Sequence, residues 1–152
     1  METFELARPF DYLTRAEMAK MISVYATELL HKSPNTERPE CTQFTDLNQA
    51  NDDLQPYVIT SCQLGLMGMN GDGIGVLEVF SPMKTITRAE VGTILSRLLR
   101  GTTYATQTKE EAYYGRHLQA LQNAGIMRII SHPEMLELRG NVLLMLQRSI
   151  EK

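Results

Sequence analysis

The sequence predicts an all-α fold, and three features lead to this prediction. The tetrapeptide Thr-Arg-Ala-Glu occurs twice, beginning at Thr14 and at Thr87. A proline lies six residues before the arginine of each copy, and apolar residues with helical spacing follow the arginine. Two other segments with helical character end at Gly65 and Gly125. Repetition of such segments within one chain is typical of a fold assembled from helical units.

The segment after each repeated arginine is expected to form an amphipathic helix. Apolar residues stand three, six, seven and ten places after Arg15 and Arg88, and a shorter version of this pattern follows Arg139. These offsets place the apolar side chains on one face of a helix. The residues are Met18, Met21, Ile22 and Tyr25 in the first copy, Val91, Ile94, Leu95 and Leu98 in the second, and Val142, Met145 and Leu146 in the third.

The residues around the repeated arginines also predict where two of these helices begin. Thr14 and Thr87 are suited to the N-cap position, and Glu17 and Glu90 follow three residues later. In such a capping box the hydroxyl accepts an N–H of the first turn, and the carboxylate accepts the N–H of the cap residue. The most repeated motif of the chain therefore has a structural explanation that needs no ligand.

Two further helices are predicted to precede the motif in the second and third copies. One extends over about residues 54–64 and ends at Gly65, and the other extends over about residues 113–124 and ends at Gly125. Glycine just after a helix adopts the left-handed conformation readily, and the leucine or isoleucine that follows each glycine supplies a typical hydrophobic contact. The distance from glycine to proline is longer in the middle copy, so residues 68–76 are interpreted as an inserted loop.

These elements divide the chain into one domain of three units. Residues 1–33 form a half unit, because only about a dozen residues precede Thr14. Residues 34–101 form a second unit with a loop insertion, and residues 102–152 form a degenerate third unit in which glycine and asparagine follow Arg139. Either the N-terminus was trimmed from a longer protein, or a partner segment completes the first unit.

Composition and motifs exclude several classes of function. The 152 residues are 43% hydrophobic and 22% charged, with a net charge of −3 and no basic stripe, which argues against nucleic acid as a partner. No stretch approaches the roughly 20 apolar residues of a membrane span. The histidines at positions 31, 117 and 132 show no ligand spacing, and no nucleophile–base or paired-carboxylate pattern occurs. We therefore expect no enzyme activity, no metal and no cofactor.

The two cysteines, Cys41 and Cys62, allow a single intramolecular pairing. One interpretation is a disulfide, which Cys41 favours because it lies in a polar, proline-containing stretch. The other is two buried free thiols, which pack as small hydrophobic side chains. A disulfide would indicate an exported protein, since such bonds persist in oxidising compartments.

The repeated arginines are candidates for binding. Arg15 and Arg88 are predicted in the first turn of a helix, where the helix dipole is mildly unfavourable for a cation. A carboxylate or another anion would suit this place, together with the unpaired N–H groups of the first turn. Alternatively, each arginine pairs with a carboxylate of an adjacent unit, for instance Asp46 or Asp11.

The middle unit contains a distinctive set of residues, namely Phe44, Asp46, Gly65, Gly68, Phe80, Pro82 and Thr87-Arg88-Ala89-Glu90. This pattern resembles the S-layer homology (SLH) domain family, and the resemblance extends over nearly the whole chain. It implies an all-α module of three tandem helix-loop-helix units in a pseudo-threefold arrangement. Such modules anchor exported proteins non-covalently to secondary cell-wall polysaccharide, which often carries pyruvate ketals.

The resemblance implies a site as well as a fold. Arg15, Arg88 and Arg139 would contact an acidic glycan from grooves between units, with Asp46 as a further groove residue. The chain has no tryptophan, so stacking on sugar rings would be left to tyrosines. We expect a cell-surface anchor that binds an acidic polysaccharide. The alternative is a protein–protein interaction or surface-assembly module on the same scaffold, without glycan binding.

Overall fold

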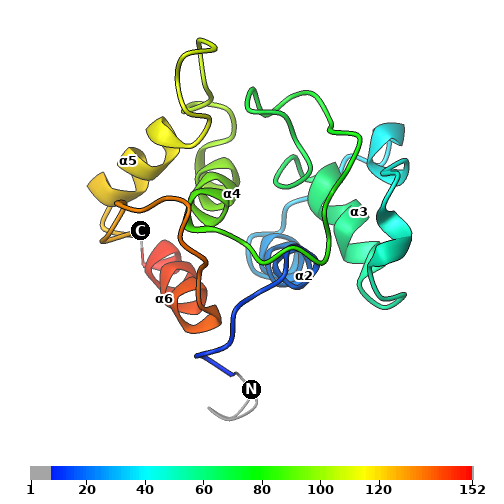
Figure 1. Cartoon of the computed structure of the whole chain (residues 1–152), viewed down its shortest axis with the longest axis horizontal. Coiled ribbons are helices and arrows are strands. Elements are labelled where there is room, and N and C mark those ends of the chain that lie inside the picture. The colour runs from blue at the N-terminus through cyan, green and yellow to red at the C-terminus, as the bar shows by residue number, and fades with distance from the viewer. Residues whose placement is uncertain (1–7, 152) are drawn as a thin grey trace.

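The computed structural model describes residues 8–151, and within this range the chain contains five α-helices and no β-strand (Figure 1). The prediction of an all-α fold is confirmed. A π-helical turn (Tyr25–Leu29) and two 3-10 turns (Pro39–Thr42 and Leu47–Gln49) complete the regular structure. The helices are α2 (Arg15–Val24), α3 (Gln55–Gln63), α4 (Arg88–Arg100), α5 (Gly115–Asn123) and α6 (Arg139–Ile150).

The three repeated arginines occupy the same place in their helices, because each is the first residue of α2, α4 or α6. Thr14 and Thr87 cap α2 and α4 through complete capping boxes with Glu17 and Glu90, as predicted. Leu138 precedes α6 and provides no side-chain cap. The predicted apolar faces of all three helices point into the core.

The two helices predicted to end at glycine do so. Gly65 and Gly125 both have φ of +76°, and the N–H of the residue after each glycine bonds to a carbonyl of the last helical turn. The isoleucine or leucine and the methionine that follow are buried, as the C-cap pattern predicts. The predicted start of α5 at residue 113 is wrong by two residues, since Tyr113 and Tyr114 form a turn before the helix.

Helices pack in two close pairs, α2 with α3 and α4 with α5, so each arginine helix of the first two units is covered by the first helix of the next unit (Figure 1). Cys41 and Cys62 form a disulfide with 5.5 Å between their Cα atoms, which joins the first 3-10 turn to α3. The disulfide prediction is confirmed. No helix within residues 8–151 has the length and apolarity that crossing a membrane requires.

Hydrogen bonds link the three repeated segments in a closed ring. The backbone N–H of each arginine donates at 2.8 Å, and the N–H of the next residue donates at 2.9 Å, to carbonyls in the proline segment of another unit. Helix α2 bonds to the segment before α4, α4 to the segment before α6, and α6 to the segment before α2. The pairs are Arg15 to Lys84 and Ala16 to Pro82, Arg88 to Met135 and Ala89 to Pro133, and Arg139 to Asp11 and Gly140 to Pro9.

The residue before each of these prolines has a left-handed backbone, with φ of +48° at Arg8, +58° at Ser81 and +55° at His132. This conformation is uncommon for residues other than glycine. Because it occurs at three matching positions, the three segments have the same backbone conformation there as well as a similar sequence.

Candidate functional site

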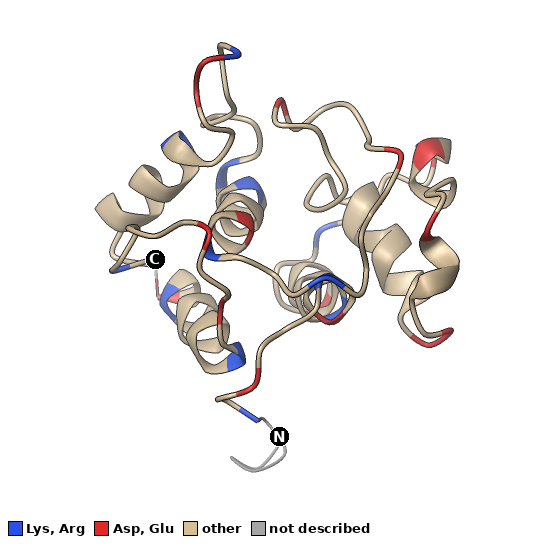
Figure 2. Cartoon of the chain, viewed as in Figure 1, with Lys and Arg blue, Asp and Glu red and all other residues tan. Residues whose placement is uncertain are grey.

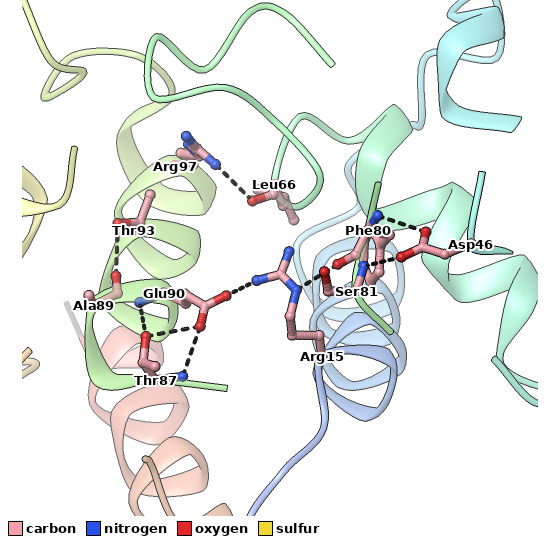
Figure 3. Close-up of polar contacts among 10 residues, drawn as sticks. All are labelled: Arg15, Asp46, Leu66, Phe80, Ser81, Thr87, Ala89, Glu90, Thr93 and Arg97. Atoms are coloured by element: carbon pink, nitrogen blue, oxygen red, sulfur yellow. Dashed lines mark hydrogen bonds and ion pairs between the residues drawn. The ribbon is translucent and has the colours of Figure 1, made fainter. Parts of the chain in front are cut away.

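The arginines that open α2 and α6 are paired with glutamates of another helix. Figure 3 shows the first of these pairs, Arg15 with Glu90. Arg15 Nη1 contacts Glu90 Oε2, and Arg139 Nη2 donates to Glu17 Oε2 at 3.0 Å. Glu17 and Glu90 are the capping glutamates, whose other oxygens accept the N–H of the cap threonines. One carboxylate therefore caps its own helix and also binds the arginine that begins a different helix.

Arg88, at the start of α4, has a different kind of partner. Its Nε donates to Glu137 Oε2 at 3.2 Å, and both side chains are almost fully buried. At the position of the capping glutamates, α6 has Asn141. Glu137 instead precedes the helix, at a position where the other two copies bury Leu13 and Ile86. All three motif arginines are thus paired with a carboxylate from another unit.

Asp46 and Asp11, the two carboxylates named above as examples of such partners, bind other groups. Asp46 Oδ1 accepts the N–H of Phe80 at 2.9 Å, and its Oδ2 accepts the N–H of Ser81 at 2.8 Å. The left-handed turn directs two successive N–H groups at this carboxylate, so Asp46 fixes the turn and does not line a groove. Asp11 lies 3.7 Å from Arg8 instead.

A groove of about 360 Å³ lies next to Arg15, which the structure places between α2, the segment before α4 and the loop after α3. Arg15 is held on one side of it, since its Nε donates to Phe80 O at 2.8 Å and its guanidinium lies 5.1 Å from the centre of the Phe80 ring. We call this cavity the Arg15 groove. Its lining comprises Arg15, Met69, Asn70, Gly71, Leu77, Val79, Phe80, Ser81, Lys84, Glu90 and Tyr113.

The Arg15 groove combines positive charge with apolar and hydroxyl groups. Glu90 neutralises Arg15, but Lys84 is exposed and makes no ion pair within the described residues. Burial lowers the pKa of Arg15, partly opposed by Tyr113 and Asp46, and a guanidinium remains charged at neutral pH. Burial also raises the pKa of Tyr113 above 10, so its phenol is a neutral hydrogen-bonding group. The groove therefore offers an anion one unpaired cation beside polar and apolar surfaces.

A second, smaller groove of about 180 Å³ lies next to Arg88. Three guanidinium groups, those of Arg88, Arg128 and Arg148, line it together with the single carboxylate of Glu137. Arg148 Nη1 donates to a backbone carbonyl at 3.2 Å, and Arg128 is exposed without an ion pair in residues 8–151. Counted from the helix-ending glycine, Arg128 occupies the place of Gly68 in the middle unit. We call this cavity the Arg88 groove; it is the more cationic of the two.

Arg139 contributes to neither groove. Its side chain is largely covered, and its Nε has no hydrogen-bond partner among residues 8–151. Of the four residues predicted to bind glycan, the structure thus places Arg15 and Arg88 in grooves, while Asp46 and Arg139 support the structure around them.

A buried pair, Ser96 and His117, was not anticipated from the sequence. Nδ1 of His117 lies 2.6 Å from Ser96 Oγ, and its Nε2 has no hydrogen-bond partner in the part of the chain that the structure describes. The ring is fully buried between α4 and α5. Burial, with a smaller contribution from Arg97, lowers the pKa of His117 to about 4. The ring is therefore neutral near pH 7 and inaccessible to a substrate. A serine stands eight residues after both Arg15 and Arg88, and this repetition could have indicated a shared contact at that position.

Comparison with known proteins adds no identification, because no protein family model matches this chain and no curated protein matches it in sequence. The fold and the grooves define a helical protein of linked, repeated segments.

Proposed function

We propose that this chain is a non-covalent cell-wall anchoring module that binds an acidic secondary cell-wall polysaccharide. The observation that carries the proposal is the Arg15 groove, where an unpaired Lys84 stands among polar and apolar groups suited to a charged sugar. The sequence resemblance to SLH modules supports the same function. Within this proposal the three units form a pseudo-threefold arrangement, which the closed ring of hydrogen bonds supports.

The chemistry of the groove suggests how an acidic sugar would bind. A carboxylate, such as that of a pyruvate ketal, would accept from Lys84 and from the part of Arg15 not engaged by Glu90. Leu77 and Val79, which are partly exposed, and the ring of Tyr113 would contact the apolar face of the sugar. Such a site would recognise both the charged substituent and the ring of the sugar.

The disulfide supports the proposed location at the cell surface. A bond between Cys41 and Cys62 persists in oxidising surroundings such as those met by exported proteins, and it is rare in reducing compartments. Figure 2 shows acidic and basic residues interspersed along the chain. We therefore include an extracellular, wall-bound location in the proposal.

A binding experiment with purified cell-wall polysaccharide tests the function. We expect the chain to co-sediment with polysaccharide that carries its acidic substituents and to lose binding when those substituents are removed chemically. The affinity should also fall with added salt, because an exposed lysine–carboxylate contact is screened. Equal binding to both polysaccharides would contradict recognition of charge, and no binding to either would reject the anchor.

A second candidate function is an assembly module on the same scaffold. The observation that favours it is the pairing of all three motif arginines with glutamates, which leaves their charge largely satisfied without a ligand. An assembly module would not bind polysaccharide and would instead bind a protein. The same sedimentation experiment separates the two candidates.

A further inference from the structure

Helices α4 and α6 carry a second arginine at the same place. Arg97 and Arg148 each stand nine residues after the motif arginine of their helix. Arg97 Nη1 donates to Leu66 O at 3.3 Å (Figure 3), and Arg148 Nη1 donates to Ile126 O at 3.2 Å. Leu66 and Ile126 directly follow the glycines that come after α3 and α5. The same contact therefore holds the two guanidinium groups in two units.

The two arginines differ in what binds the rest of the guanidinium group. Arg97 Nη2 donates to Asn70 O at 2.9 Å, and Asn70 belongs to the inserted loop of the middle unit, residues 68–76. The third unit has no such insertion. Within residues 8–151, Arg148 makes no side-chain hydrogen bond besides that to Ile126 and no ion pair. The donors that Arg97 directs at the loop are thus unpaired in Arg148, which lines the Arg88 groove.

Arg128 adds a cation that the middle unit does not have. The matching residue there is Gly68, which has φ of +74°, and a Cβ atom on it would lie 2.5 Å from the ring of Phe44. The middle unit therefore has no room for a side chain at this place. Arg128 is exposed, makes no ion pair in the described part of the chain, and lines the Arg88 groove. Both differences between the units make this groove more cationic.

The charge and the size of the Arg88 groove restrict its ligand. Arg88 and Glu137 neutralise one another, so Arg128 and Arg148 leave two positive charges unbalanced in the lining, although the chain as a whole is negative. A concave surface of one sign attracts ions of the opposite sign. The volume of about 180 Å³ is below the roughly 300 Å³ at which typical small-molecule sites begin. The groove therefore suits a compact, doubly charged anion better than a sugar ring.

We propose that the Arg88 groove binds a phosphate group through the guanidinium groups of Arg128 and Arg148. A phosphate monoester carries a charge of about −1.5 to −2 at pH 7 and three strong acceptor oxygens, which match two guanidinium forks. A carboxylate carries a single charge and would leave one of the two arginines unbalanced. Arg88 stays bonded to Glu137 and supports the groove. The proposal is independent of the polysaccharide function, because the two grooves share no residue.

Two ligands of the same shape test the recognition of charge. Methyl phosphate and methyl sulfate are both tetrahedral, but at about pH 8 the phosphate carries one more negative charge. We expect the full chain to bind methyl phosphate at least about tenfold more tightly in isothermal titration calorimetry. Equal affinity for the two, or no binding of methyl phosphate at about 10 mM, would overturn the proposal. Inorganic phosphate is the third probe: if it binds more tightly than methyl phosphate the ligand is the free ion, and if more weakly it is an ester, and either result supports the site.

Three variants of equal charge locate the site. Arg128→Gln and Arg148→Gln should each weaken methyl phosphate binding about tenfold or more, because each removes a charge-assisted contact. The matched control is Arg100→Gln, which removes an exposed arginine outside the Arg88 groove and should bind like the parent. Circular dichroism establishes that the variants are folded, and Arg128 is exposed, so its replacement should not disturb the core. If Arg128→Gln binds methyl phosphate as well as Arg100→Gln does, the groove is not the phosphate site. Lys84→Ala should leave phosphate binding unchanged, which separates this test from that of the Arg15 groove.

Discussion

Asn141 Nδ2 donates a hydrogen bond to Glu137 Oε1 at 2.8 Å, while the other oxygen of the same carboxylate accepts from Arg88. In α2 and α4 the residue at the place of Asn141 is itself the glutamate that binds an arginine. The third unit therefore also has the ion pair, but its carboxylate lies four residues closer to the N-terminus. The asparagine hydrogen-bonds to this carboxylate and orients it.

Glu137→Leu should show how much this relocated carboxylate matters. Leucine matches the residues that the other copies bury at this position, but it leaves the buried Arg88 without a partner, at a cost of about 3–5 kcal/mol. Urea unfolding measures the loss. Adding Asn141→Glu restores the arrangement of the other two units, so the double variant should recover most of the lost stability.

The recovery is the critical outcome. If Glu137→Leu and the double variant were equally destabilised, the carboxylates at the two positions would not be interchangeable. The single variant Asn141→Glu serves as the control, since it brings a second carboxylate toward Glu137 and should not stabilise the chain.

The sequence predicted those features that depend on neighbouring residues. Capping boxes, apolar faces and glycine-ended helices are local, and Thr14 and Gly65 behave as expected. The partners of the arginines were not predictable in this way, because Arg15 and Glu90 are far apart in the chain and meet only when the ring closes. The sequence shows asparagine at position 141 in place of the capping glutamate of the other two units. It does not show that Glu137 supplies the carboxylate instead, because the other units have an apolar residue at the position of Glu137.

The grooves were predicted only in part. The repeated arginines indicated where a site would lie, but Lys84 and Tyr113 carry no motif and come together only through the packing of the loop after α3. Asp46 was predicted as a groove residue because it matches the family pattern. Its two hydrogen bonds to the turn before Pro82 show that a pattern residue can be retained for the backbone that it holds.

His117 predicts a specific dependence of stability on pH. Its pKa is about 4 in the folded chain and about 6.5 when unfolded. Between these pH values the imidazole is protonated in the unfolded chain but stays neutral in the folded chain. The stability from neutral His117 is complete above pH 6.5 and is lost as the pH falls toward 4, by at most about 3 kcal/mol. His117→Asn keeps a group that can bond to Ser96 but cannot titrate, so its unfolding free energy should vary less between pH 7 and 4.

The parent chain is the reference for His117→Asn. Carboxylates also titrate below pH 5, and they contribute equally to both proteins. The informative quantity is therefore the difference in unfolding free energy between His117→Asn and the parent at each pH. A constant difference would show that His117 does not cause the acid sensitivity.

The disulfide should contribute measurably to stability. The bond closes a loop between residues separated by 21 positions, and restriction of the unfolded chain by such a loop is worth about 3 kcal/mol. Cys41→Ala/Cys62→Ala should lower the unfolding free energy by about this amount. Reducing agent should destabilise the parent but not the double variant, and a destabilisation of both would indicate an effect of the reagent unrelated to the bond.

Asp46 is expected to affect binding indirectly, because it holds Phe80 and Ser81, which line the Arg15 groove. Asp46→Asn retains the shape of the side chain but places an amide NH₂ against one of the two N–H groups that the carboxylate accepts. The expected loss is about 1–2 kcal/mol in unfolding free energy, together with weaker polysaccharide binding. Asp53→Asn, at an exposed position before α3, is the control and should change neither quantity. Weaker binding without any loss of stability would indicate that Asp46 contacts the ligand itself.

Lys84 allows the proposed glycan contact to be tested without disturbing the fold. Arg88 and Arg139 are less suitable for this test, because both are covered and paired, so their removal would leave a carboxylate without its partner. Lys84→Ala removes an exposed, unpaired cation of the Arg15 groove and should weaken binding of acidic polysaccharide about tenfold or more, with unchanged stability. Lys32 is also exposed and does not line the Arg15 groove, so Lys32→Ala should bind like the parent. Because the contact is between charges in water, the difference between the two variants should shrink as salt is added. If Lys84→Ala and Lys32→Ala bind equally well at low salt, the Arg15 groove is not the glycan site, and the assembly module becomes the better explanation of the paired arginines.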